Sequence, residues 1–189
     1  MALTLDGSAA TAGASGTSTT VTLTCSSAGN VIRVSATYNS GSSCQISSVT
    51  ATGATFAYLY RRYATAGTQD GLEVWEGYAS GTFNATITVT MSASTTYLTV
   101  HAYGVNGAPS SAWEDTNGGM PYNAGYPTSP CDPIAVTTAN ANDIILGHFR
   151  EASTASPTEA SSVCARSAAP PTTRTPTRPS SSARSWSAR

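Results

Sequence analysis

Residues 85–91 read Ala-Thr-Ile-Thr-Val-Thr-Met, a regular alternation of apolar side chains with threonine. Because successive side chains of a β-strand point to opposite faces of a sheet, this pattern places Ile87, Val89 and Met91 on one face and the threonines on the other. Residues 20–25 repeat the alternation, with Val, Leu and Cys between threonines. The sequence therefore predicts two half-buried strands with a threonine-rich outer side.

Similar strand-like segments, separated by turn residues, follow one another along most of the chain. No window has the 3.6-residue periodicity of an amphipathic helix. Many short strands without helices predict an all-β fold, and we expect a two-layer antiparallel β-sandwich of the jelly-roll or immunoglobulin-like kind. The remaining expected strands are residues 31–38, 44–49, 55–60, 72–75, 97–103, 134–137 and 143–149.

The periodicity stops at residues 104–133, which are rich in proline and glycine. A connection of this length inside a domain is usually functional, or crosses between sheets. We predict one β-sandwich domain over residues 1–163, with 104–133 as a long crossover loop. Residues 164–189 have a different composition and form a separate, irregular Arg/Pro/Ser-rich tail.

The chain has 189 residues with ten acidic side chains, nine arginines and no lysine. The absence of lysine excludes a P-loop, a Schiff base and a serine–lysine nucleophile. Residues 1–163 carry four arginines and all ten acids, whereas residues 164–189 carry five arginines and no acid. The net charge of -1 is therefore the sum of an acidic domain and a basic tail.

Two interpretations of the tail remain open. A genuine basic tail would be disordered, or would lie over a neighbouring subunit, and its arginines would contact a partner or nucleic-acid phosphates. Alternatively, a shifted reading frame produced this segment, because with GC-rich codons the other frame of residues 169–189 permits an apolar final strand. The arginines assigned to tail contacts are Arg174, Arg178, Arg184 and Arg189.

The sequence gives little support to catalysis or metal binding. His101 and His148 have no third ligand at metal spacing, and no G-x-S-x-G nucleophile motif occurs. Asp115 and Asn117 could offer oxygens to calcium, but the EF-hand spacing is missing. We expect no enzyme activity, no metal and no cofactor. The acids available for a glycosidase pair are Glu73, Glu76, Glu114, Asp115 and Asp132.

The four cysteines lack the close paired spacing of zinc or thioredoxin sites, and we expect them to be buried or opportunistically paired. Their pairing is not determined by the sequence. The N-terminus shows no signal-peptide pattern and no run is long enough to span a membrane, so we expect synthesis in the cytoplasm. The cysteines are Cys25, Cys44, Cys131 and Cys164.

Aromatic and arginine side chains make binding a better-supported function than catalysis, because aromatic faces stack on sugars or partner side chains and arginine adds planar hydrogen bonding. In the other interpretation, alternate members of the first cluster fill the core. That first cluster is Tyr58, Tyr60, Arg61, Arg62, Tyr63, Trp75 and Tyr78. A second group in the crossover loop is Trp113, Tyr122 and Tyr126.

The order of strand and turn motifs carries a family resemblance over residues 20–150. It runs from Ile46-Ser47-Ser48-Val49-Thr50, through residues 72–78 with the Ser80-Gly81-Thr82 turn and the strands at 84–91 and 97–104, to residues 142–147. In this order the chain resembles the jelly-roll or immunoglobulin-like sandwich domains of tailed-phage virion proteins and of some bacterial surface proteins.

This resemblance implies a structural protein of a phage virion, either a capsid decoration (cement) subunit or a tail accessory subunit. The expected partners are the major capsid or tail subunits and further copies of the chain, with attachment by many repeated protein–protein contacts. The virion would be its location, after synthesis in the host cytoplasm. The alternative is a carbohydrate- or receptor-binding adhesin module that uses the first aromatic cluster.

Overall fold

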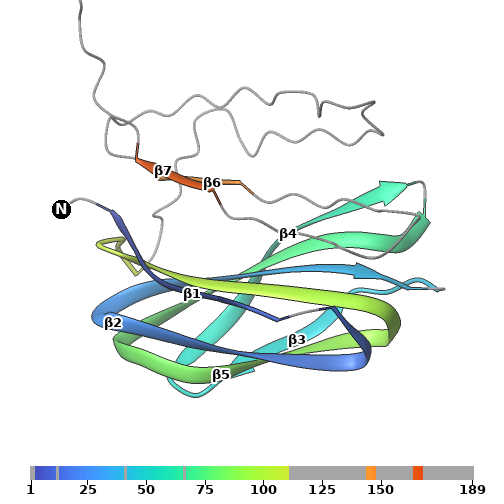
Figure 1. Ribbon diagram of the computed structural model, residues 1–189, viewed down its shortest axis with the longest axis horizontal. Coiled ribbons are helices and arrows are strands. Elements are labelled where there is room, and N and C mark those ends of the chain that lie inside the picture. Colours follow the sequence, from blue (N-terminus) through green and yellow to red (C-terminus); the bar gives the residue numbers. More distant parts are fainter. Residues whose placement is uncertain are drawn as a thin grey trace, which may run out of the picture.

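Figure 1 shows the computed structural model, which describes residues 3–11, 13–40, 42–65, 67–110, 144–147 and 164–167. The regular secondary structure of these residues is entirely β-strand, and every strand pairing is antiparallel. The strands are β1 (Thr4–Ala10), β2 (Ala14–Asn39), β3 (Ile46–Ala51), β4 (Ala54–Thr65), β5 (Gly67–Asn106), β6 (Ile144–Gly147) and β7 (Cys164–Ser167).

Two long strands, β2 and β5, organise the main sheet because they pair with each other twice. Residues 18–24 of β2 pair with residues 84–90 of β5. Residues 30–39 of β2 lie between residues 70–79 and 97–106 of β5 and pair with both. Each long strand therefore contributes to two parts of one sheet.

We name these two parts the threonine arm and the central arm. The threonine arm consists of residues 18–24 of β2, residues 84–91 of β5, and β3 on the other side of β5. The central arm has the order β1, residues 97–106, residues 30–39, residues 70–79 and β4.

The sheet curls because β2 and β5 both bend between the arms. In β2 the pairing register shifts between Thr24 and Asn30, and Gly29 has a left-handed φ of 74° that other residues rarely adopt. Register shifts of this kind are bulges, which bend a strand and increase its twist. The bends turn the two arms toward each other, as Figure 1 shows for β2 and β5.

Asp6 of β1 ties the bend of β2 to the sheet edge. Its Oδ1 accepts hydrogen bonds from the Ser26 amide at 2.9 Å and the Ser26 hydroxyl at 2.7 Å. Its Oδ2 accepts from the Ser27 amide at 2.8 Å and from Asn30 Nδ2 at 3.1 Å. Slight burial acts to raise the pKa of Asp6, but these hydrogen bonds outweigh it and hold the pKa well below its ordinary value.

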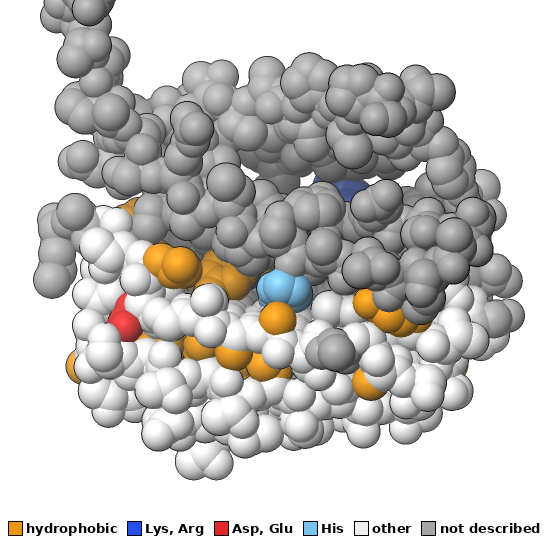
Figure 2. Space-filling model, viewed as in Figure 1, with side chains coloured by type: hydrophobic (Ala, Val, Ile, Leu, Met, Phe, Trp, Pro, Cys, Tyr) orange, Lys and Arg blue, Asp and Glu red, His pale blue; other side chains and the backbone are white. Residues whose placement is uncertain are grey.

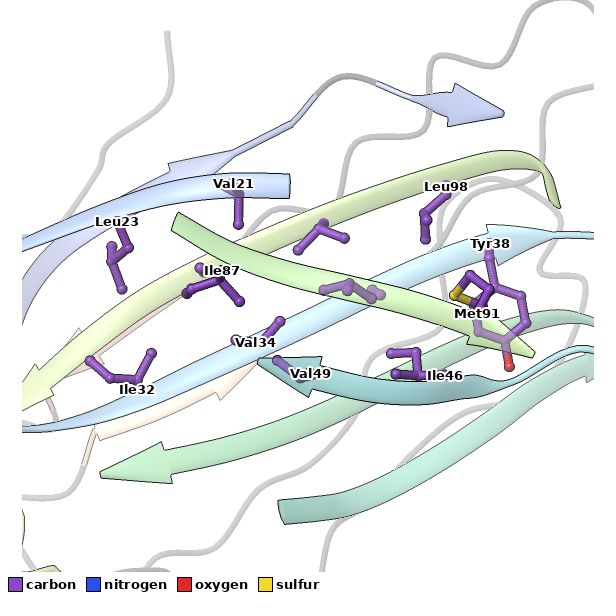
Figure 3. Close-up of a cluster of buried hydrophobic side chains, with 14 of the residues drawn as sticks. Val21, Leu23, Ile32, Val34, Tyr38, Ile46, Val49, Ile87, Met91 and Leu98 are labelled. Carbon is purple, nitrogen blue, oxygen red and sulfur yellow. The ribbon is translucent and has the colours of Figure 1, made fainter. Parts of the chain in front are cut away.

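The hydrophobic core lies between the two arms. Figure 3 shows side chains of both arms pointing toward one another, among them Leu23 and Ile87 from the threonine arm and Val34 from the central arm. All three are fully buried. Burying an aliphatic side chain of this size contributes about 1.5–3 kcal/mol relative to leaving it exposed. The alternation predicted for residues 85–91 is confirmed, since Ile87, Val89 and Met91 are all in this core.

The expected fold class is confirmed at the level of an all-β protein with antiparallel strands in a curled sheet. The prediction of separate strands at 20–25 and 31–38 is wrong, because both belong to β2, and residues 72–75, 85–91 and 97–103 likewise belong to β5. The turn residues between them bend the strand without removing it from the sheet. The sequence of β1 has no alternation of apolar and polar residues that would predict a strand. The strand is instead held by backbone pairing with residues 101–106.

A small second sheet pairs β6 with β7 in antiparallel register, from Ile144 opposite Ser167 to Gly147 opposite Cys164. The β6 strand lies inside the strand expected at residues 143–149. The tail was expected to be irregular from residue 164, yet its first four residues form β7, because their backbone can pair with the apolar β6 segment. The crossover loop was expected to begin at residue 104, but β5 continues to Asn106. Residues 111–133 of that loop, the expected strand at 134–137 and residues 168–189 lie outside the described residues.

Candidate functional site

The aromatic and arginine cluster predicted for binding lies on β4 and the neighbouring residues 70–79 of β5. A register shift between Tyr58 and Tyr60 changes which side chains share a face. As a result, Tyr58 lies opposite Trp75 and Arg61 lies opposite Glu73, all on the core side of the sheet. The predicted cluster is therefore split between two faces.

The core-side group is Tyr58, Arg61, Tyr63 and Trp75, which we call the Tyr58 platform. The rings of Tyr58 and Trp75 meet edge to face, with centroids 6.0 Å apart and an interplanar angle of 83°. The Arg61 guanidinium lies 5.4 Å from the Tyr58 ring centroid and 5.8 Å from that of Tyr63. These distances are within the range of cation–π contacts, so the rings and the guanidinium support one another.

Tyr58 is the exposed member of the platform, with 49% of its surface accessible. Trp75 and Tyr63 are half-buried and pack against the hydrophobic core. Trp75 and Tyr63 thus fill the margin of the core, whereas Tyr58 presents its ring to the surface.

Glu73 is the acidic centre beneath the platform, and it is fully buried. Its Oε1 lies 2.9 Å from Arg61 Nε and its Oε2 accepts a hydrogen bond of 2.9 Å from Arg61 Nη2. Oε1 also accepts from the Tyr38 hydroxyl at 2.9 Å and from the Ile46 amide at 2.8 Å. This carboxylate of β5 therefore joins β2, the start of β3 and β4 through three hydrogen-bond donors and an ion pair.

The network changes the titration of its members. Burial, together with the charge of Glu73, raises the pKa of Tyr38 far above its ordinary value. The hydrogen bond with Glu73 raises the pKa of Arg61, so the guanidinium stays charged at any pH of interest. The Arg61 guanidinium and the Glu73 carboxylate form an ion pair that links β4 to β5.

The remaining members of the cluster, Tyr60, Arg62 and Tyr78, lie on the opposite face of the sheet. The Arg62 guanidinium is 5.9 Å from the Tyr60 ring centroid. Tyr78 packs against a second hydrophobic cluster that contains Val31 and Tyr103. Burial raises the pKa of Tyr103 well above its ordinary value. This group stabilises the central arm and does not join the Tyr58 platform.

The acids considered for glycoside hydrolysis are separated by the strand geometry. Glu73 and Glu76 are three residues apart on β5, so they point to opposite faces, and each is paired with an arginine. Glu76 Oε2 lies 2.9 Å from Arg33 Nη2. These two carboxylates do not converge. Glu114, Asp115, Asn117 and Asp132 lie outside the described residues.

Other chemistry-bearing groups are dispersed. Burial lowers the pKa of His101, which has no cluster of ligands around it. Cys25 and Cys44 are buried free thiols, and burial raises the pKa of Cys25 to about 11. In the part of the chain that the structure describes, no group of three or more His, Cys, Asp or Glu side chains could hold a metal ion, and no helix could cross a membrane.

A further surface, not predicted as a site, is the outer side of the threonine arm. Its exposed residues pair across the strands: Thr22 Oγ1 lies 3.0 Å from Thr86 Oγ1, and the Thr24 hydroxyl donates a 3.1 Å hydrogen bond to Asn84 Oδ1. We call this uncharged surface the hydroxyl face. In Figure 2 most of the described surface is white, the colour of uncharged polar side chains and backbone. Its members are Thr20, Thr22, Thr24, Asn84, Thr86 and Thr88.

The loop aromatics Trp113, Tyr122 and Tyr126 and the tail arginines Arg174, Arg178, Arg184 and Arg189 lie outside the described residues, as does His148. Sequence reasoning missed the role of Glu73, which it grouped with solvating or catalytic acids. The sequence signal for this role was a glutamate in the middle of an apolar strand pattern, opposite a strand that carries arginines.

Comparisons with protein-family models, curated proteins and solved structures found no match for the chain.

Proposed function

We propose that this chain is a non-enzymatic structural subunit of a phage virion, which decorates the capsid or belongs to the tail. It would be made in the host cytoplasm and attach to capsid or tail subunits through many symmetric copies. The proposal extends to the fold: the two arms of the curled sheet would be the layers of a jelly-roll or immunoglobulin-like β-sandwich. The core enclosed between the arms supports this architecture.

The observation that carries the proposal is the hydroxyl face. Two neighbouring strands, β2 and β5, present threonine and asparagine on this surface, without a charged side chain. The centres of protein–protein interfaces are depleted of charged residues, because burying a charge is costly. Threonine is also stiff at χ1, so ordering it at an interface costs little entropy.

Repetition would make such a surface effective. Each hydroxyl face offers modest contacts, but a symmetric particle presents many copies at once. Linked binding events raise the overall avidity by about 10²–10⁴ without strong individual contacts. A rigid, uncharged face with cross-strand hydrogen bonds suits this mode of attachment better than catalysis.

The test is co-sedimentation of the purified protein with phage particles that lack it. We expect the wild type to sediment with the particles and a Thr22→Arg, Thr86→Arg double variant to lose most of its binding, because two charges would be buried against a partner. Thr55→Arg, at an exposed position on β4, is the control and should bind normally. A monomer that does not bind particles, or a gene without neighbouring capsid, portal or tail genes, would contradict the proposal.

A further inference from the structure

The Tyr58 platform is a second candidate surface, and it differs from the hydroxyl face in kind. Tyr58 and Leu5 are the exposed large hydrophobic side chains of the described residues, at 49% and 46% accessible surface. They lie on β4 and β1, which occupy opposite sides of the central arm. Among the described residues, no other exposed large hydrophobic side chain lies on the same side of the central arm as Tyr58.

The ring is held in place by its neighbours. Trp75 contacts it edge to face, and the Arg61 guanidinium lies 5.4 Å from its centroid. Arg61 is in turn fixed by two contacts with the buried carboxylate of Glu73. A ring braced in this way loses little freedom when a ligand binds, which is the usual advantage of a preorganised site.

The charge of the platform restricts the chemistry of its ligand. The positive charge of Arg61 is neutralised by Glu73 at 2.9 Å, so the platform does not offer an unpaired cation to an acidic group. A negatively charged ligand therefore finds no unpaired positive charge to bind here, so the platform does not favour it over a neutral ligand. The electron-rich face of an aromatic ring attracts weakly positive C–H groups. Neutral pyranose sugars present such C–H groups on one face and hydroxyls around the edge.

We propose that the Tyr58 platform binds a neutral pyranose sugar, which stacks its C–H face on the ring of Tyr58. The hydroxyl of Tyr58 and Nη1 of Arg61 have no partner among the described residues and are suited to hydrogen bonds with the sugar's hydroxyl groups. One pyranose ring matches the size of one exposed tyrosine ring. Glu73 is a positioning residue for this site, because it acts through Arg61. The proposal does not depend on virion attachment, which would use the hydroxyl face.

The experiment uses the full chain on an array of oligosaccharides that end in neutral hexoses or N-acetylhexosamines, beside matched oligosaccharides that end in sialic or uronic acids. We expect binding to neutral termini and weaker binding to acidic ones. The strongest neutral oligosaccharide is then titrated calorimetrically against the variants. Tyr58→Ala should weaken its affinity by about tenfold, because a stacking contact of this kind is lost.

Two variants control for folding and for generic apolar contact. Tyr58→Phe keeps the ring and should retain affinity to within about threefold, since it loses one hydrogen bond at an exposed site. Leu5→Ala removes a side chain of similar exposure from the other side of the sheet and should bind like the wild type. Absence of binding to all neutral sugars, preference for acidic sugars, or an unchanged affinity in Tyr58→Ala would overturn the proposal. Particle co-sedimentation reports separately on attachment, so the two proposals can fail independently.

Discussion

The threonine arm and the central arm belong to one sheet but differ in how many of their faces are buried. In residues 20–24 and 85–91 of the threonine arm, apolar and polar side chains alternate, so one face enters the core and the other is more exposed. In the central arm, residues 30–38 are buried on both faces and include Arg33, Ser35 and Thr37. The buried charged side chains of this arm, Arg33 and Glu73, are each paired with an opposite charge, Glu76 and Arg61 respectively. The buried hydroxyls of Ser35 and Thr37, by contrast, have no hydrogen-bond partner within the described part of the chain.

This difference indicates where each arm should be sensitive. Substitutions on the outer face of the threonine arm should have little effect on stability, whereas substitutions on its inner face should be strongly destabilising. In the central arm, a charge that loses its partner should be destabilising, because the remaining charge is left in a poorly solvated position. Three experiments test this contrast, from the largest expected effect to the smallest.

Replacing Glu73 with alanine should have the largest effect. The change leaves the Arg61 guanidinium and the Ile46 amide without this acceptor, and of its described acceptors the Tyr38 hydroxyl keeps only the Cys44 carbonyl at 3.1 Å. Breaking a buried ion pair typically costs about 3–5 kcal/mol in the free energy of unfolding. Urea denaturation followed by tryptophan fluorescence measures this loss.

Glu76→Ala is the matched control for Glu73→Ala, since it breaks the neighbouring pair with Arg33 on the opposite face. Glu76→Ala removes a carboxylate that pairs with one group, the Arg33 guanidinium, whereas Glu73→Ala removes an acceptor shared by groups on three other strands. We expect a smaller loss of stability than for Glu73→Ala. Equal losses in the two variants would show that the hydrogen-bond network around Glu73 has no special structural role.

The second experiment compares adjacent residues on the two faces of the threonine arm. Ile87→Ala removes a fully buried side chain and should cost about 2–5 kcal/mol. Thr86→Ala removes an exposed hydroxyl that pairs with Thr22, and the cost should be within about 0.5 kcal/mol. Chemical denaturation of both variants checks the prediction. A large cost for Thr86→Ala would mean that the outer face contributes to folding and is not reserved for binding.

The third experiment concerns Asp6, whose pKa in the folded protein lies well below its ordinary value. A depressed folded-state pKa stabilises the protein above the unfolded-state pKa of about 4, and this contribution is lost as the pH falls further. We expect Asp6→Asn to have a lower melting temperature than the wild type at neutral pH, and the difference should shrink below about pH 4. A difference that is constant with pH would contradict the assigned role of the carboxylate.

Several features of the fold follow from local sequence. The alternation at 20–25 and 85–91 correctly predicts the inner and outer faces of the threonine arm, and the absence of helical periodicity predicts an all-β protein. The continuity of β2 and β5 could not be predicted, because serine and glycine residues mark turns and strand bends equally well. The start of β1 was also not predictable, since its residues are small and its pairing partner lies about one hundred positions away.

The candidate site shows the same limits. Clustering in the sequence identifies the aromatic and arginine residues of β4, but it does not divide them. The register shift between Tyr58 and Tyr60 places Tyr58 and Arg61 on one face and Tyr60 and Arg62 on the other. Such a shift depends on the pairing with β5, which local sequence does not encode.

The sequence by itself determined the residue types, their alternation and the absence of lysine, which predict the β-structure of the described residues and exclude lysine-dependent chemistry. The tertiary structure alone decided that Glu73 is a buried structural carboxylate and that Tyr58 is an exposed, braced ring. The physical reason is that side-chain periodicity is a local property of a strand. The burial of a charge and the partners that neutralise it depend on which distant strands lie beside it.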